Sequence, residues 1–107
     1  MITYHVLYNP HAGNGRGKET AYRLATLLPD DKILFQDITE VDDYGGFFDS
    51  LPHDDRVVIA GGDGTLNRFI NDTAPLIIER NIYYFATGSG NDFLTDIGGK
   101  ASDTSRP

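Results

Sequence analysis

The sequence of 107 residues contains no cysteine, so it forms no disulfide, thiolate nucleophile or cysteine-based metal site. It also lacks any run of about 18 apolar residues, the minimum expected for a transmembrane helix. The opening residues, MITYH, have neither the basic nor the apolar segment of a signal peptide. These absences predict a cytoplasmic protein.

Basic residues are scarce as well. Nine Lys and Arg stand against 16 Asp and Glu, which gives a formal net charge of -7. Nucleic acids and anionic membranes both require clustered Lys and Arg, so we predict no nucleic-acid partner and no polybasic membrane anchor. A small anion is still a possible ligand, because the backbone amides at the start of a helix bind anions without any net positive charge.

The residues that are present predict one α/β domain. Segments rich in β-forming residues predict strands at residues 2–9, 32–38, 56–60 and 81–86. Apolar residues at helical spacing predict helices at 18–28, 41–51 and 65–74, and a short helix from Asn91 that carries Phe93, Leu94 and Ile97. This alternation predicts a three-layer fold, with a mostly parallel sheet and helices on both faces.

Glycine-containing loops follow the first, third and fourth predicted strands: PHAGNGRG (10–17), GGDG (61–64) and TGSG (87–90). One such loop alone is most simply a turn. In a parallel sheet, however, all strand-to-helix loops emerge at the same edge, where open α/β sheets bind ligands. The combination of loops therefore favours a ligand site at that edge.

The middle loop has the most specific chemistry. Glycines at 61, 62 and 64 are expected to allow positive φ angles and to leave backbone amides open to an anion, with the hydroxyl of Thr65 nearby. Asp63 does not suit a bare phosphate, but it suits a phosphate with a divalent cation, or a ribose hydroxyl. We therefore predict a nucleotide with Mg²⁺. The alternative is that Asp63 only stabilises a turn.

Two common nucleotide motifs are missing. The sequence has no G-x-x-x-x-G-K-[ST], which excludes a P-loop. Its first loop reads G-x-G-x-G, and Asp37 is only a weak ribose ligand, so a dinucleotide-binding Rossmann domain fits poorly. The histidines, His5, His11 and His53, are dispersed and suggest no general base.

The stretches NPHAGNGRG, GGDGTLN and GSGNDF resemble the N-terminal, nucleotide-binding domain of the diacylglycerol kinase catalytic family, which includes bacterial lipid kinases and sphingosine and ceramide kinases. The resemblance makes residues 1–99 the nucleotide-binding domain. Residues 100–107 are small and polar and are expected to form a frayed tail. NAD kinases and phosphofructokinases have related GGDG loops. The opening Asn-Pro and the closing Gly-x-Gly-Asn-Asp-Phe favour the lipid-kinase branch.

The resemblance implies ATP and Mg²⁺ as cofactors. It implies nucleotide contacts from Asn9 and Pro10 through Gly13, and from Thr39. It implies a phosphate and ribose site formed by Gly61, Gly62, Asp63, Gly64, Thr65 and Asn67. Asp63 would lie close to Mg²⁺, directly or through water. Ser89 stands where the family usually has Thr, and it keeps the hydroxyl.

The chain also departs from the family pattern. Arg68 stands where the family usually has Glu, and Ala86-Thr87 replace the usual Pro-Leu. Family enzymes add a β-rich second domain that supplies a catalytic Asp and much of the lipid site. The sequence ends before such a domain, so residues 1–107 alone are expected to be inactive.

Three functions remain open at this stage. The first is the ATP-binding part of a kinase that phosphorylates a lipid hydroxyl, with transient contact to a membrane surface. The others are a NAD kinase-like enzyme and a non-catalytic nucleotide-binding module. The sequence does not fix the oligomeric state, and a homodimer is one option.

Overall fold

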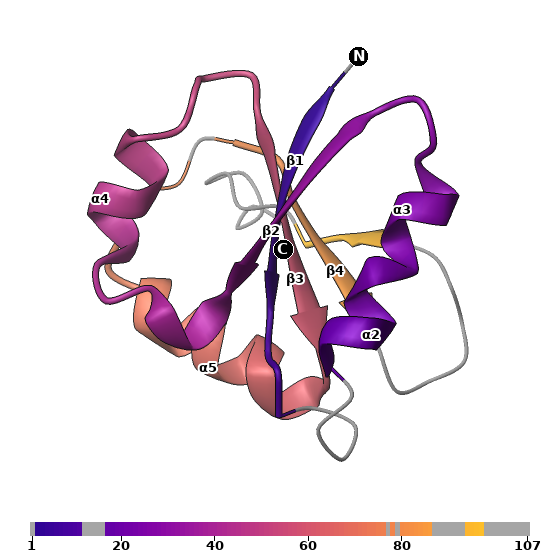
Figure 1. Ribbon diagram of the computed structural model, residues 1–107. Coiled ribbons are helices and arrows are strands. Elements are labelled where there is room, and N and C mark those ends of the chain that lie inside the picture. Colours follow the sequence, from indigo (N-terminus) through magenta and orange to yellow (C-terminus); the bar gives the residue numbers. More distant parts are fainter. Residues whose placement is uncertain (1, 12–16, 77, 79, 87–93, 98–107) are drawn as a thin grey trace.

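The computed structural model describes residues 2–11, 17–76, 78, 80–86 and 94–97. Its centre is a five-stranded sheet in the order β2-β1-β3-β4-β5 (Figure 1). The parallel strands are β1 (Thr3–Tyr8), β2 (Lys32–Asp37), β3 (Arg56–Gly61) and β4 (Ile82–Ala86). The last strand, β5 (Leu94–Asp96), runs antiparallel to β4. The predicted mostly parallel α/β sheet is thus confirmed.

Helices cover both faces of the sheet, as predicted (Figure 1). Helices α2 (Gly17–Tyr22) and α3 (Leu24–Leu27) lie on one face, and α4 (Tyr44–Asp49) and α5 (Asp63–Thr73) lie on the other. A short 3-10 helix, η1 (Ile38–Glu40), follows β2. None of the described helices is long and apolar enough to cross a membrane.

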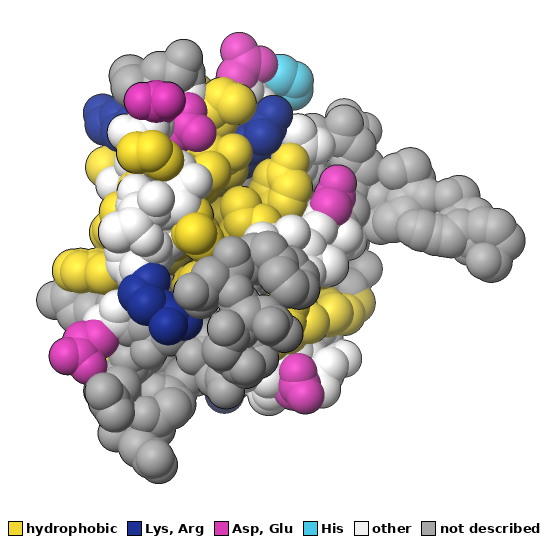
Figure 2. Space-filling model, turned by 90° about the vertical axis from the view of Figure 1, so that its right-hand side faces the viewer, with side chains coloured by type: hydrophobic (Ala, Val, Ile, Leu, Met, Phe, Trp, Pro, Cys, Tyr) yellow, Lys and Arg dark blue, Asp and Glu magenta, His cyan; other side chains and the backbone are white. Residues whose placement is uncertain are grey.

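The central strand β3 is buried from both sides, which explains its unbroken apolar sequence. Val58 and Ala60 pack into the cluster under α2 and α3, whereas Val57 and Ile59 pack into the cluster under α4 and α5. The short α2 and α3 cover their face incompletely, so Tyr83 and other apolar side chains of that cluster are only partly buried. Figure 2 shows hydrophobic side chains at the surface on this side of the molecule.

The prediction of a short helix after the fourth strand is wrong for the residues that the structure describes there. Residues 94–96 form β5, in which Leu94 pairs with Phe85 and Thr95 pairs with Tyr84. Without β5, the backbone groups on this side of β4 would be unpaired, and pairing satisfies more of them than a single helical turn does. The start of the predicted helix, at Asn91 and Phe93, lies outside the described residues.

Three predicted helices also have different bounds in the structure. The one expected at 41–51 is shorter, as α4, because the Asp43 side chain caps its start. The helix expected at 18–28 is interrupted at Arg23, between α2 and α3. The helix expected from Thr65 begins earlier, at Asp63, with Gly62 as its N-cap. Asp63 therefore belongs to the first turn of α5 and not to a loop.

Arg80 connects the end of α4 to the segment that leads into β3. Its guanidinium donates hydrogen bonds of 2.8 to 3.3 Å to the carbonyl oxygens of Phe48, Leu51, Pro52 and Asp55. The last carbonyls of a helix have no partner within the helix. The carbonyl oxygens of Phe48 and Pro52 also accept from the backbone N–H groups of Leu51 and Asp55, so Arg80 adds a second, charged donor there and bonds the carbonyls of Leu51 and Asp55 as well.

We expect Arg80→Met to lower the free energy of unfolding by about 2–3 kcal/mol, because several half-buried carbonyls lose a charged donor. Urea denaturation measures the change. The matched control is Lys32→Met, which removes an exposed cation from the edge strand β2 and should cost less than about 0.5 kcal/mol. A similar, small loss in both variants would show that the Arg80 contacts contribute little.

Candidate functional site

The carboxyl ends of β1, β3 and β4 lie at one edge of the sheet. Strand β1 is paired with β3 up to Tyr8 and Ala60, and β3 is paired with β4 up to Gly61 and Ala86. The strand ends that precede the three glycine loops therefore lie at the same edge, as predicted, although residues 12–16 and 87–90 of the loops lie outside the described residues. Of their proposed ligand-binding residues, Gly13 and Ser89 lie outside the described residues.

The glycines between β3 and α5 differ from one another in the space around them. A Cβ atom at Gly61 would lie 2.7 Å from the Cβ and Oγ1 atoms of Thr65, so only glycine fits without a shift. A Cβ atom at Gly62 or Gly64 would meet no protein atom within 4 Å. The first turn of α5 is therefore open to a ligand at these two positions.

The positive φ angles predicted for these glycines are not found. Gly62 has φ -95° and ψ -172°, which is extended backbone, and neither Gly61 nor Gly64 lies in the left-handed region. The chain enters α5 from an extended residue directly into helical geometry, so no left-handed turn is needed. Glycine is required at 61 by close packing, whereas the missing side chains at 62 and 64 leave open space beside the helix start.

Asn9 connects the end of β1 to the first turn of α5. Its side-chain amide donates to the Thr65 hydroxyl at 2.9 Å, and its side-chain oxygen accepts from the backbone N–H of His11 at 2.9 Å. A hydroxyl that accepts from Asn9 keeps its own proton for donation to another acceptor. Thr65 is thereby oriented as a donor at the helix start, and Pro10, which follows Asn9 in the chain, is half-buried.

Tyr84 is a neighbour of Asp63 that the sequence did not reveal. Its hydroxyl lies 3.2 Å from the carbonyl oxygen of Gly61. Burial raises the pKa of the Tyr84 phenol, and the nearby Asp63 carboxylate raises this pKa further through its charge and a hydrogen bond. The phenol is therefore a proton donor at neutral pH, placed beside an exposed carboxylate.

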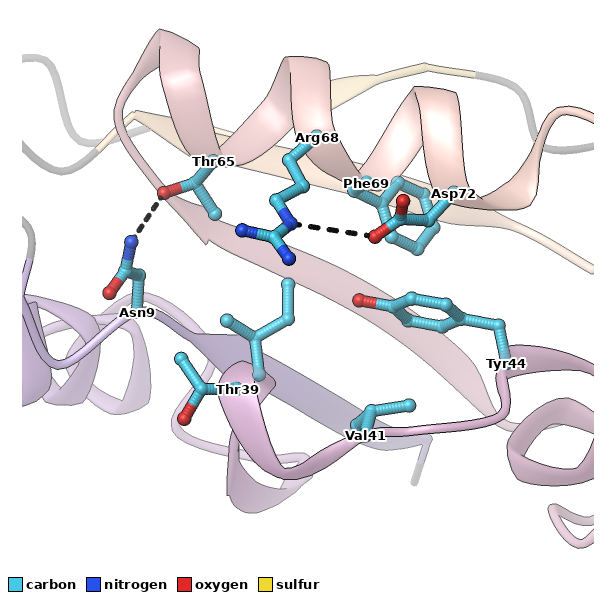
Figure 3. Close-up of a pocket in the computed structure, with 9 residues that line it drawn as sticks. Asn9, Thr39, Val41, Tyr44, Thr65, Arg68, Phe69 and Asp72 are labelled. Carbon is cyan, nitrogen blue, oxygen red and sulfur yellow. Dashed lines mark hydrogen bonds and ion pairs between the residues drawn. The ribbon is translucent and has the colours of Figure 1, made fainter.

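A cavity of about 190 Å³ begins at the Asn9–Thr65 contact and extends between η1 and α5 (Figure 3). Its walls include the apolar side chains of Ile38, Val41 and Phe69. Thr39 also lines it, although its hydroxyl donates to Asp37 at 2.7 Å. Asn67 is exposed and does not line this cavity, so the structure does not bring it together with Asn9, Thr39 and Thr65.

The other end of the cavity carries charged and polar side chains from α4 and α5. Arg68 and Asp72 lie one turn apart on α5, with the guanidinium Nε 3.7 Å from a carboxylate oxygen. Burial and the charge of Asp72 raise the pKa of Tyr44, although Arg68 acts in the opposite direction. The hydroxyl of Tyr44 points toward Arg68 in the cavity (Figure 3).

The donor set at the start of α5 suits Mg²⁺ only if a ligand contributes oxygens. Among the described residues, no group of three or more His, Asp or Glu could hold a metal ion. Mg²⁺ is usually held by one or two carboxylates together with phosphate oxygens and water. Asp63, in the open first turn of α5, fits this pattern.

The histidines of the described segments lie outside this donor set. His5 is bonded to Asp55 at 2.7 Å, near the amino end of β3 and away from the start of α5. His11 contacts Asn9 through its backbone, and its side chain is exposed. The expectation that the histidines form no catalytic group stays a prediction.

Comparison with known proteins assigns the family. The family model of the diacylglycerol kinase catalytic domain matches residues 3–106, which is nearly the whole chain. No match is found among curated proteins or solved structures. The matched region includes β1, the whole β3–α5 connection and β5, so the family's pattern extends over every element of the described sheet. The chain belongs to the diacylglycerol kinase catalytic domain family, and hence to a family of kinase-type phosphotransferases.

Proposed function

We propose that this chain is the ATP-binding part of a lipid kinase, which transfers the γ-phosphoryl group of ATP to a lipid hydroxyl. The observation that carries the proposal is the open first turn of α5, where a Cβ atom at Gly62 or Gly64 would have no neighbour within 4 Å and Asp63 lies between them. A helix start of this kind attracts phosphate through its free amides and its dipole. The family match supplies the phosphoryl-transfer chemistry.

Each residue of the site has a distinct role in this proposal. The amides at Gly62 and Gly64 and the hydroxyl of Thr65 bind phosphate oxygens, and Asn9 fixes the orientation of that hydroxyl. Asp63 would hold Mg²⁺ directly or through water, and the chemistry that Mg²⁺ would supply there is neutralisation of the phosphate charge. Gly13 and Ser89 remain proposed nucleotide contacts from the family resemblance.

The candidate functions differ in the molecule that accepts the γ-phosphoryl group of ATP. The natural protein that carries residues 1–107 should be incubated with γ-labelled ATP and Mg²⁺, once with diacylglycerol in mixed micelles and once with NAD. Label in the lipid supports the proposal. Label in NAD alone would instead favour the NAD kinase-like function, and nucleotide binding without any transfer would favour a non-catalytic module.

We expect Tyr84→Phe to raise by about three- to tenfold the Mg²⁺ concentration needed for half-maximal enhancement of ATP affinity. The variant loses the phenol hydroxyl that donates to the Gly61 carbonyl and lies beside the Asp63 carboxylate, and loss of one hydrogen bond costs about 1 kcal/mol. Calorimetric titration of ATP over a Mg²⁺ series measures the shift. The control is Tyr83→Phe, on the opposite face of β4. Equal Mg²⁺ dependence in both variants would show that the Tyr84 hydroxyl does not position Asp63.

A further inference from the structure

We propose that Tyr44, Arg68 and Asp72 form the base-recognition end of the nucleotide site, with the Asp72 carboxylate accepting a hydrogen bond from the exocyclic amine of adenine. This inference rests on the proposed function, because the phosphates are placed at the start of α5. It concerns the adenine base, which the helix start does not contact. All three side chains line one continuous cavity with Asn9 and Thr65 (Figure 3).

The length of α5 between the two ends of the cavity suits a nucleoside. Thr65, at the phosphate end, and Asp72 are separated by seven positions in the sequence. At 1.5 Å per residue these positions are roughly 10 Å apart along the helix axis. A nucleoside bound along the cavity, with its phosphates at the helix start, would bring the outer edge of its base to Asp72.

The walls of the cavity suit a flat ring. Ile38 and Val41 contribute apolar surface from the η1 side, and Phe69 contributes it from α5. The Tyr44 ring packs edge-on against Phe69, with centroids 5.3 Å apart at 86°, so its position is fixed by an aromatic contact. Apolar walls with a few polar groups at one end are typical of small-molecule sites.

The polar groups complement the edge of adenine. The Arg68 Nε lies 3.7 Å from an Asp72 carboxylate oxygen, which is too long for a hydrogen bond. Both side chains can therefore still form hydrogen bonds with a ligand. Asp72 offers only acceptors, which matches an amine, whereas Arg68 offers only donors, which match the ring nitrogens. The raised pKa of Tyr44 keeps its hydroxyl available as a further donor.

The test compares ATP with purine riboside triphosphate, which lacks the exocyclic amine. Calorimetry with Mg²⁺ should show that the parent chain prefers ATP by about tenfold, the value of one hydrogen bond to a charged group. Asp72→Ala should remove this preference, and Asp72→Asn, which keeps an acceptor, should retain part of it. Asp49→Ala, an exposed change on α4, is the matched control and should leave the preference intact.

The outcomes separate this inference from the proposed function. A parent chain that binds both triphosphates equally, or an Asp72→Ala variant that keeps the full preference, would overturn the inference while leaving ATP binding in place. A folded parent chain that binds neither triphosphate would overturn the proposed function and the inference with it.

Discussion

Replacing Gly62 by valine should weaken ATP binding by about 100-fold or more, since two or more charged hydrogen bonds to phosphate are lost at about 1.5–3 kcal/mol each. Gly62 is the N-cap of α5, and a Cβ atom there meets no protein atom within 4 Å. The valine side chain would therefore occupy the space through which a phosphate reaches the helix amides. Its φ of -95° is accessible to valine, so the backbone does not oppose the change.

The stability of the same variant should change by less than about 1 kcal/mol, the usual cost of a poorer N-cap residue. Gly62→Ala should give an intermediate loss of affinity, because it adds a smaller side chain in the same direction. Gly45→Ala, on α4, is the control and should bind ATP as the parent does. If Gly62→Val binds ATP with the parent's affinity, the phosphates bind elsewhere.

Asp63→Asn should remove most of the gain in ATP affinity that Mg²⁺ provides. We expect Mg²⁺ to strengthen ATP binding by about tenfold or more in the parent and by less than about threefold in the variant, because a carboxylate is the usual protein ligand that ties phosphate-bound Mg²⁺ to a site. Asparagine keeps the size of the side chain but not its charge. Calorimetric titrations with Mg²⁺ and with a chelator measure both values.

The same substitution also distinguishes the two roles considered for Asp63. A carboxylate in the first turn of a helix interacts with the helix dipole, so some loss of stability, about 0.3–1 kcal/mol, is expected in either case. Asp49→Asn, remote from the start of α5, provides the control. A variant that keeps the full effect of Mg²⁺ would assign Asp63 to helix stabilisation alone.

The parts of the fold that local sequence determines were predicted well. Strand β3 has an apolar run without alternation, and the structure buries it between two layers of helices. The sequence could not show that residues 94–96 form a strand, because this depends on pairing with β4. A short apolar segment is compatible with either a helix or a strand until its partner is known.

Only those parts of the candidate site that local sequence determines could be predicted. The GGDG motif indicated an open helix start, and Asn9 and Thr65 indeed meet there through a hydrogen bond. Tyr84 lies on a different strand, and only the register of β3 and β4 brings it to Gly61 and Asp63. The positive φ angles expected at the glycines were wrong, because glycine is also used where space, and not conformation, is limiting.

The central claim is that ATP phosphates bind at the first turn of α5. Nuclear magnetic resonance of the ¹⁵N-labelled chain, titrated with ATP in the presence of Mg²⁺, tests this claim residue by residue. We predict that the largest amide shifts occur at Gly62, Gly64 and Thr65, with smaller shifts at Thr39 and Asp72 along the cavity. Saturating shifts confined to other surfaces, with the amides of Gly62 to Thr65 unchanged, would contradict the claim.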